Sequence, residues 1–256
     1  MKFYVSAATD VGVRKQVNQD SLSVKRFLTP DGEVIFAVLC DGMGGLQHGE
    51  LASKSIVQAF SDWGDQILTQ LLRSPLEDHR IRKEWERIVS EQNKLLRSYG
   101  LRNGCELGST VCVLLLSQRR YYILNIGDSR VYEIGASVRQ LTQDHTVVAE
   151  AVRLKNLTPE QAAKAPMQNV LTRCVGVSET VFPDLFFGVP RSGVTYMLCS
   201  DGFRHHISEE ELRFYLLRSE DDGEIFDIRQ RTHMLIEKNK QRGETDNISV
   251  IAIYTQ

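Results

Sequence analysis

The chain has 256 residues, of which 42% are hydrophobic and 25% are charged. This composition is typical of a globular protein and excludes a collagen, a coiled coil and a disordered chain, while the length suits one domain with a sizeable core. The formal net charge is only -2, so the chain has no overall basic field that would hold nucleic acid or an anionic membrane.

The beginning of the chain is rich in short apolar runs that are typical of strands, the first of which is Phe3–Ala8. Asp31-Gly32 is typical of a tight turn, and it separates the strand-like segments Asp20–Phe27 and Glu33–Cys40. We therefore predict a β-hairpin over these two segments.

Two long helices are predicted after the hairpin. Apolar residues recur at helical spacing from Gly49 to about Leu72 and again from about Arg80 to Tyr99. Each helix has one apolar face, so each should cover a sheet. Strand-like runs then return at Val111–Leu116, Tyr121–Ile126, Val194–Cys199 and Ile248–Tyr254.

The segment from Thr146 to Asn169 differs from its surroundings because it is polar and helix-prone and contains no strand of its own. Within it, Thr158-Pro159-Glu160-Gln161 indicates a short capped helix. A surface segment of this length between strands more often has a function than not. The alternative is an insertion without a function.

Two more helices complete the pattern. One is predicted to begin at Ser208, because Ser208 and Glu211 have the spacing of a capping box, and the other to span Glu224 to Lys240. Connections between neighbouring strands are too short for helical crossovers, which favours antiparallel pairing. We therefore predict an α+β fold, a four-layer α-β-β-α sandwich of two antiparallel sheets flanked by helix pairs, in a single domain over residues 1–256.

The cysteines indicate a reducing compartment. There are five of them, none in a CxxC pair, and Cys40 and Cys199 lie inside apolar runs, which is typical of reduced core thiols. The N-terminus lacks the apolar core of a signal peptide, and the longest apolar runs are too short to span a bilayer. We expect a cytoplasmic protein with no membrane partner.

Aspartates stand at the ends of several predicted strands. Asp41 directly follows one strand, and Asp201 and Asp128 each follow another after a single residue. Asp246 opens the last strand and Asp20 opens an early one. Because an antiparallel strand begins beside the ends of its neighbours, these carboxylates could gather at one rim of the sheets. The alternative for any one of them is an ordinary turn.

Clustered carboxylates beside buried strands would repel one another and lose hydration unless a cation compensated them. The ligands are all oxygen, and no Cys/His set has zinc spacing, so Mg²⁺ or Mn²⁺ is favoured over Zn²⁺. Gly42 after Asp41 permits a tight turn that exposes a carbonyl ligand. Paired metal ions suit hydrolysis at phosphorus, and Arg14 and Lys15 lie close enough before Asp20 to orient a phosphate.

These motifs together resemble those of the metal-dependent type 2C (PPM) serine/threonine protein phosphatases. The similar segments follow in the family's order: Asp10–Asp20, Asp41–Gly45, Gly108–Thr110, Gly127–Arg130, Leu141–His145, Ser200–Gly202 and Asp246-Asn247. They cover essentially the whole chain, which looks like the compact bacterial branch of the family.

The resemblance implies a centre of two Mn²⁺ or Mg²⁺ ions. Asp41 and the carbonyl of Gly42 would serve both ions, and Asp20, Asp201 and Asp246 would complete the shell. It also implies that a hydroxide bridging the metals attacks phosphorus directly, so that no phosphoenzyme forms.

Other segments gain roles from the same resemblance. Asp128 matches a weaker third metal site, so two or three ions are expected, and residues 146–169 occupy the place of the flap beside the active site. The family's phosphate-binding arginine usually lies five residues before the first metal aspartate; here that position is Lys15, with Arg14 one residue earlier, and either could serve. Met43 stands where animal members often carry a histidine that could act as a general acid. His48 is close in sequence, although a surface histidine is the alternative for it.

We therefore predict a protein-serine/threonine phosphatase that acts on phosphorylated proteins and opposes the Ser/Thr kinases of the same bacterial cell, as a monomer. The alternative is a catalytically silent member that binds phosphoproteins or a partner. A two-metal nuclease would need a basic track for the nucleic-acid backbone, and the near-neutral charge argues against one. His205 and His206 would point in opposite directions in an extended segment, so we do not expect them to share a metal.

Overall fold

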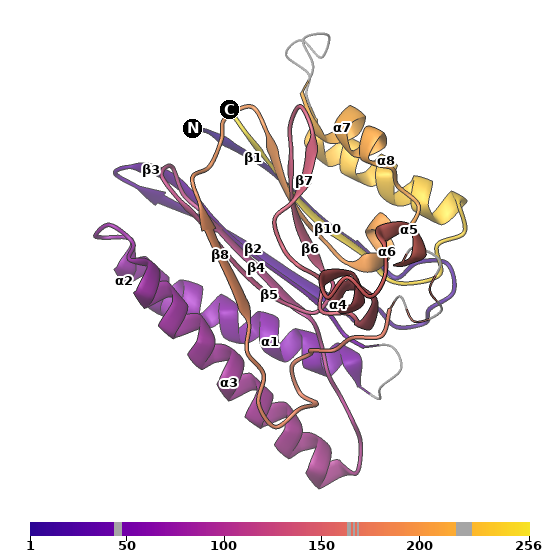
Figure 1. Cartoon of the computed structure of the whole chain (residues 1–256). Coiled ribbons are helices and arrows are strands. Elements are labelled where there is room, and N and C mark those ends of the chain that lie inside the picture. Colours follow the sequence, from indigo (N-terminus) through magenta and orange to yellow (C-terminus); the bar gives the residue numbers. More distant parts are fainter. Residues whose placement is uncertain (44–47, 163–164, 166, 168, 219–226) are drawn as a thin grey trace.

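The computed structural model describes residues 1–43, 48–162, 165, 167, 169–218 and 227–256, which form two stacked β-sheets with helices on both outer faces (Figure 1). Sheet A has the strand order β1-β10-β9-β6-β7, and sheet B has the order β2-β3-β4-β5-β8. The strands are β1 (Phe3–Asp10), β2 (Asp20–Thr29), β3 (Gly32–Asp41), β4 (Val111–Leu116), β5 (Tyr121–Ile126), β6 (Arg130–Ile134), β7 (Val138–Gln140), β8 (Asp184–Gly188), β9 (Thr195–Cys199) and β10 (Ile248–Thr255). All the pairings between these strands are antiparallel.

The helices lie mostly outside the sheets. They are α1 (Gly49–Trp63), the π-helix Gly64–Leu68, α2 (Thr69–Leu71), α3 (Asp78–Asn103), α4 (Val147–Arg153), α5 (Pro159–Ala162), α6 (Asp201–Arg204), α7 (Glu209–Leu216) and α8 (Ile228–Gln241). In Figure 1, α1 and α3 cover the outer face of sheet B, and α7 and α8 cover that of sheet A. The predicted α+β sandwich of four layers is confirmed.

Strand β3 shows why the central strands have continuous apolar runs. Phe36 and its alternate neighbours pack towards the helices, where Trp63 and Trp85 lie, whereas Leu39 and its alternate neighbours face the other sheet. Side chains alternate between the two faces of a strand, and both faces of this strand are buried. Leu198 of sheet A belongs to the same middle layer as Leu39.

Most predicted elements are present, with shifted ends. The hairpin is confirmed, with Thr29 paired to Gly32 and Asp20 to Asp41. The first long helix contains a π-helical turn before α2, and the second is longer than predicted. The helix predicted from Glu224 begins at Ile228, where the Asp227 side chain caps it; residues 224–226 lie outside the described part of the chain. Strands β6, β7 and β8 were not predicted.

The five cysteines are free, as expected. Cys40, Cys112 and Cys199 are buried, and burial raises the pKa of each thiol. No helix in the described part of the chain is long and apolar enough to cross a membrane.

Candidate metal centre

Asp20 and Asp41 face each other at the end of the β2–β3 hairpin, where the strand register pairs them directly. Asp20 is only 5% exposed, and neither of its carboxylate oxygens has a hydrogen-bond partner among the described residues. Burial raises the pKa of Asp20 to about 7, the nearby hydroxyl groups of Ser249 and Ser200 offset this only in part, and the negative charge of Asp201 raises the pKa further. A buried carboxylate without partners is costly, so this position calls for a cation.

The backbone of Asp41 is held by the strand-like segment that precedes β4. The Asp41 N–H donates to Thr110 Oγ1 at 2.9 Å, and the Thr110 N–H donates to the Asp41 carbonyl at 2.9 Å. Burial raises the pKa of the Asp41 side chain well above its ordinary value. The charges of the other candidate carboxylates add to this effect, in decreasing order Asp20, Asp201, Asp128 and Asp246. The predicted acidic residues therefore gather around Asp41.

Gly42 follows Asp41 at a point where no side chain fits. A Cβ atom there would lie 2.3 Å from the carbonyl oxygen of Gly49 and 2.6 Å from that of Gln19. The Gly42 N–H also donates to the Gln19 carbonyl at 3.1 Å. The glycine is therefore required by the close approach of three backbone segments directly after Asp41.

Asp201 and Asp246 come from sheet A and are brought together by a second close approach. Asp201 begins α6 directly after β9, and a Cβ atom on Gly202 would lie 2.2 Å from the carbonyl oxygen of Asn247. Backbone N–H groups fix both carboxylates: Gly202 donates to Asp201 Oδ1 at 2.7 Å, and Asn247 donates to Asp246 Oδ1 at 2.8 Å.

Asn247 connects this part of the site to the segment before β2. Its side-chain oxygen accepts the Gln19 N–H at 2.9 Å, and its amide group donates to the carbonyl oxygens of Val11 at 2.9 Å and Val17 at 3.2 Å. From the sequence, Asn247 was expected only as part of a motif, and this positioning role was not predicted. An asparagine directly after a candidate ligand was the one signal that could have indicated it.

The two candidate phosphate-binding residues lie in this clamped segment. Lys15 Nζ lies 3.2 Å from Asp246 Oδ1. Arg14 is exposed and makes no recorded hydrogen bond or ion pair with another described residue. The structure thus brings Lys15, rather than Arg14, into contact with the carboxylates.

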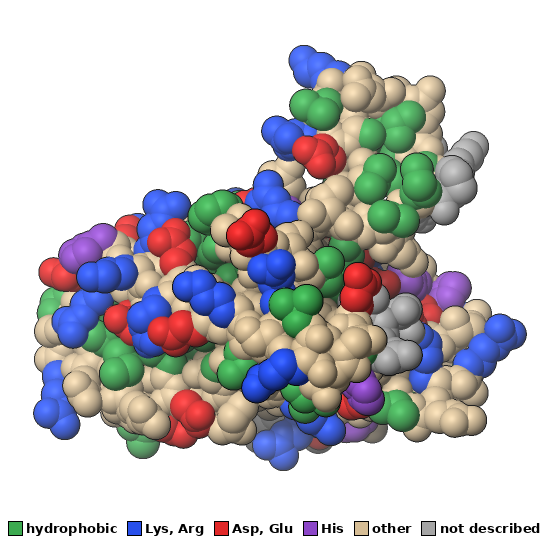
Figure 2. All heavy atoms as spheres, turned by 90° about the horizontal axis from the view of Figure 1, so that it is seen from below, with side chains coloured by type: hydrophobic (Ala, Val, Ile, Leu, Met, Phe, Trp, Pro, Cys, Tyr) green, Lys and Arg blue, Asp and Glu red, His purple; other side chains and the backbone are tan. Residues whose placement is uncertain are grey.

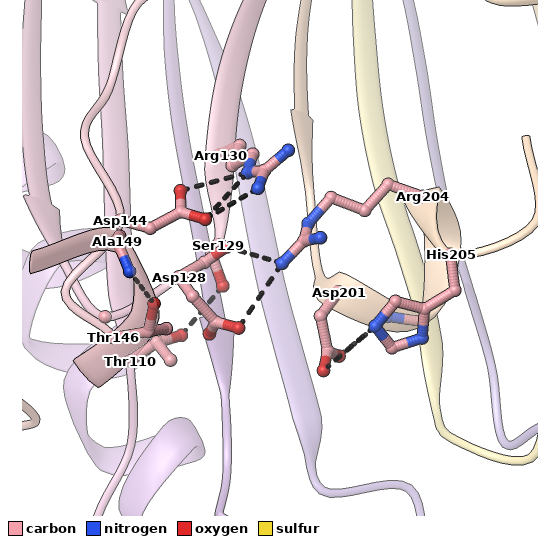
Figure 3. A network of polar contacts seen from close by, with 12 residues as sticks. Thr110, Asp128, Ser129, Arg130, Asp144, Thr146, Ala149, Asp201, Arg204 and His205 are labelled. Atoms are coloured by element: carbon pink, nitrogen blue, oxygen red, sulfur yellow. Dashed lines mark hydrogen bonds and ion pairs between the residues drawn. The ribbon is translucent and has the colours of Figure 1, made fainter. Parts of the chain in front are cut away.

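Asp128 lies in the turn that leads from sheet B to sheet A. Its neighbour Ser129 shares a hydrogen bond of 2.9 Å with Thr110, which in turn holds Asp41. Burial and the charge of Asp201 raise the pKa of Asp128 to about 6. The guanidinium group of Arg204 approaches the Asp128 carboxylate (Figure 3), a contact that was not predicted.

The residues present suit a hard divalent cation. Carboxylate and carbonyl oxygens are the ligands that Mg²⁺ and Mn²⁺ accept, and the partnerless oxygens of Asp20 would gain the compensation that they lack. Among the described residues, no three Asp, Glu, His or Cys side chains surround a common point closely enough to hold a metal ion.

Helix α4, in the segment predicted as a flap, lies across a cavity from Arg204, which contacts Asp128. The Thr146 side chain caps α4 by accepting the Ala149 N–H at 3.1 Å. A cavity of 720 Å³ lies between this helix and α6, with Val148 and Val152 on one side and Arg204 on the other.

His205 lies against a candidate metal ligand, with Nε2 3.6 Å from Asp201 Oδ2 (Figure 3). His48 is exposed, with Nδ1 3.9 Å from Glu50. The expectation for His205 and His206 assumed an extended segment and was wrong on that point, because the chain is helical up to Arg204 and both rings lie near Glu244, at 3.0 and 3.7 Å.

Comparisons with known proteins identify the family of this chain. A family model described as protein phosphatase 2C matches residues 12–231. The serine/threonine phosphatase Stp of Listeria welshimeri is 32% identical over 251 residues, which cover 96% of this chain and 93% of the relative. The structure of the serine/threonine phosphatase Stp1 from Staphylococcus aureus superposes with a TM-score of 0.85 at 25% identity, over 100% of this chain and 96% of that chain.

A further solved structure carries metal ions. The catalytic domain of the serine/threonine protein phosphatase PstP, in complex with two manganese ions, matches with a TM-score of 0.77 at 27% identity, over 98% of this chain and 97% of that chain. The chain therefore belongs to the metal-dependent protein phosphatase 2C family and is a serine/threonine phosphatase of the bacterial type.

Proposed function

We propose that the protein hydrolyses phosphoserine and phosphothreonine in phosphorylated proteins by direct attack of water on phosphorus, with two Mn²⁺ or Mg²⁺ ions. The observation that carries the proposal is the gathering of buried carboxylates around Asp41, including Asp20, whose oxygens have no partner among the described residues. The names of the relatives support the substrate class.

The ions would be held by residues from both sheets. Asp41 and the Gly42 carbonyl would contribute from the end of β3, together with Asp20 across the hairpin, and Asp201 and Asp246 would contribute from sheet A. Divalent ions there would lower the pKa of a water molecule and neutralise charge that develops on the phosphoryl oxygens.

The remaining parts of the site would orient the substrate. Lys15 is held at the rim by Asp246 and would offer its ammonium group to a phosphate oxygen, as a point charge rather than a bidentate contact. Residues 146–169 would act as the flap of a single catalytic domain that spans residues 1–256, and the cavity beside α4, which is also lined by Arg204, would offer substrate a place near Asp128.

The cellular setting follows from the same reaction. A cytoplasmic phosphatase of this kind would oppose the Ser/Thr kinases that phosphorylate its substrates, and we propose that it acts as a monomer. On the face shown in Figure 2, the described basic and acidic side chains intermingle and form no continuous basic track that would suit nucleic acid.

Hydrolysis of p-nitrophenyl phosphate and of a phosphothreonine peptide, each with and without Mn²⁺, tests the proposal. We expect Mn²⁺-dependent turnover of both substrates, its loss in Asp41→Asn, and unchanged turnover in the control Asp31→Asn, which alters an exposed carboxylate. Binding of the phosphopeptide without any turnover would instead identify a silent phosphoprotein-binding member.

A further inference from the structure

Asp128 differs from Asp20 and Asp41 because it already has a cationic partner. Arg204 Nη2 lies 3.4 Å from Asp128 Oδ2 and 3.5 Å from the Asp128 carbonyl oxygen. Both side chains are largely buried, at 17% and 7% exposure. In Figure 3 the Arg204 side chain extends from α6 across to Asp128, between Asp201 and the Arg130–Asp144 pair.

The turn that carries Asp128 is fixed in place. The Gly127 N–H donates to His145 Nδ1 at 3.1 Å, and the His145 N–H donates to the Gly127 carbonyl at 3.0 Å. Gly127 has a φ of 101°, and a Cβ atom there would lie 2.5 Å from a methyl carbon of Thr110. Asp128 therefore cannot move far from Arg204 without breaking these contacts.

The helix that carries Arg204 is anchored as well. Phe203 is fully buried, and its carbonyl group accepts a hydrogen bond of 2.8 Å from the Asn239 side chain. Gly202 lies directly against the backbone of Asn247. Because Arg204 directly follows these two residues, its side chain starts from a fixed point of the backbone.

Arg204, rather than Arg130, is available to pair with Asp128. Arg130, which lines the same cavity, is engaged by Asp144, with Nη2 2.6 Å from Oδ2. A divalent ion bound at Asp128 would lie beside the guanidinium group, and two cations so close together repel each other. Removing the arginine would leave Asp128 as a buried and uncompensated charge.

We propose that Arg204 takes the place of a third divalent ion at Asp128, so that this chain binds two ions and supplies the third cation from its own sequence. The inference rests on the proposed two-ion centre. Arg204 would then be a positioning residue that holds Asp128 in place beside the ions. Its positive charge is covalently attached, so it would remain when the concentration of divalent ions is low, whereas a weakly bound ion would dissociate.

Metal stoichiometry measured by calorimetric titration of the metal-free protein with Mn²⁺ tests the proposal. We expect two bound ions per chain in the wild type and also in Asp128→Asn. The variant Arg204→Gln should gain a third, weak site at millimolar Mn²⁺, and adding Asp128→Asn to it should remove that site. The control Arg153→Gln, which changes an arginine of the same cavity that pairs with Glu150, should bind two ions.

Two results would overturn the inference: a third site in the wild type that Asp128→Asn abolishes, or a folded Arg204→Gln variant that still binds only two ions. If Arg204→Gln does not fold, the comparison of wild type with Asp128→Asn decides the matter alone. A wild-type protein that binds no Mn²⁺ and hydrolyses no p-nitrophenyl phosphate would instead refute the proposed function, so the two failures are distinguishable.

Discussion

Asp20 shows how a single buried carboxylate couples stability to pH. Its pKa is about 7 in the folded chain, against an ordinary value of 3.8. In metal-free protein, the folded state therefore keeps a proton that the unfolded state has already lost between about pH 4 and pH 7. Stability falls as pH rises through this window and loses nothing more above it.

The variant Asp20→Asn should remove this contribution. We expect metal-free Asp20→Asn to be more stable than the wild type at pH 8, by on the order of 2–4 kcal/mol, and to differ little from it at pH 4. Urea denaturation in the presence of a chelator at both pH values measures the difference. Equal stability of the two proteins at pH 8 would contradict the raised pKa.

Lys15 and Arg14 can be separated by kinetics. Because Lys15 contacts Asp246 whereas Arg14 points to solvent, we expect Lys15→Ala to raise the KM for p-nitrophenyl phosphate roughly tenfold, which corresponds to about 1.4 kcal/mol. Arg14→Ala should change it much less. A larger effect of Arg14→Ala would assign the phosphate to the arginine.

Sequence reasoning could identify the aspartates because each stands at the start or the end of a strand-like segment, a signal that is local. It could not find the contacts of Arg204 with Asp128 or of Asn247 with Gln19, which join residues 76 and 228 positions apart. Such pairs depend on how strands and helices pack, and no local pattern marks them.

At the scale of elements, the long apolar strands and the amphipathic helices were predictable, as were the edge strands β1 and β2, whereas β6, β7 and β8 were not. Strand β8 is only half-buried along its length, and β7 has three residues, two of them exposed. Both lie at a sheet edge and pair with a neighbour on one side only, and the apolar run of β8 is only three residues long. Strand β6 is buried, but it is short and includes a charged Glu133.

The predicted capping box of α7 is present: the Ser208 side chain accepts the Glu211 N–H, and the Glu211 side chain accepts the Ser208 N–H at 3.1 Å. We expect Ser208→Ala to lower the free energy of unfolding by about 1 kcal/mol, while Ser90→Ala, an exposed serine within α3, should have little effect. Urea unfolding measures both variants. An unchanged Ser208→Ala would mean that the ion pairs of Glu211 with Lys238 and Arg242 suffice to hold the start of the helix.

For the whole molecule, the proposed metal centre lies where the two sheets meet. Binding of a ligand to the folded state alone adds about 2.7 kcal/mol of stability at a hundredfold excess over its dissociation constant. We therefore expect Mn²⁺ to raise the melting temperature of the wild type and of Asp31→Asn but not of Asp41→Asn, as measured by differential scanning calorimetry. A rise of the same size in Asp41→Asn would place the ions elsewhere.

The division of the carboxylates between the sheets has a mechanical consequence. Asp20 and Asp41 belong to sheet B, whereas Asp201 and Asp246 adjoin strands of sheet A, and the thickness of the layer that contains Leu39 and Leu198 sets the gap between the two groups. The geometry of the proposed metal centre therefore depends on how closely sheet A and sheet B pack together. A small cavity created in that layer, far from any reacting atom, would let one sheet shift against the other. The affinity for the ions would then fall before the chain unfolded.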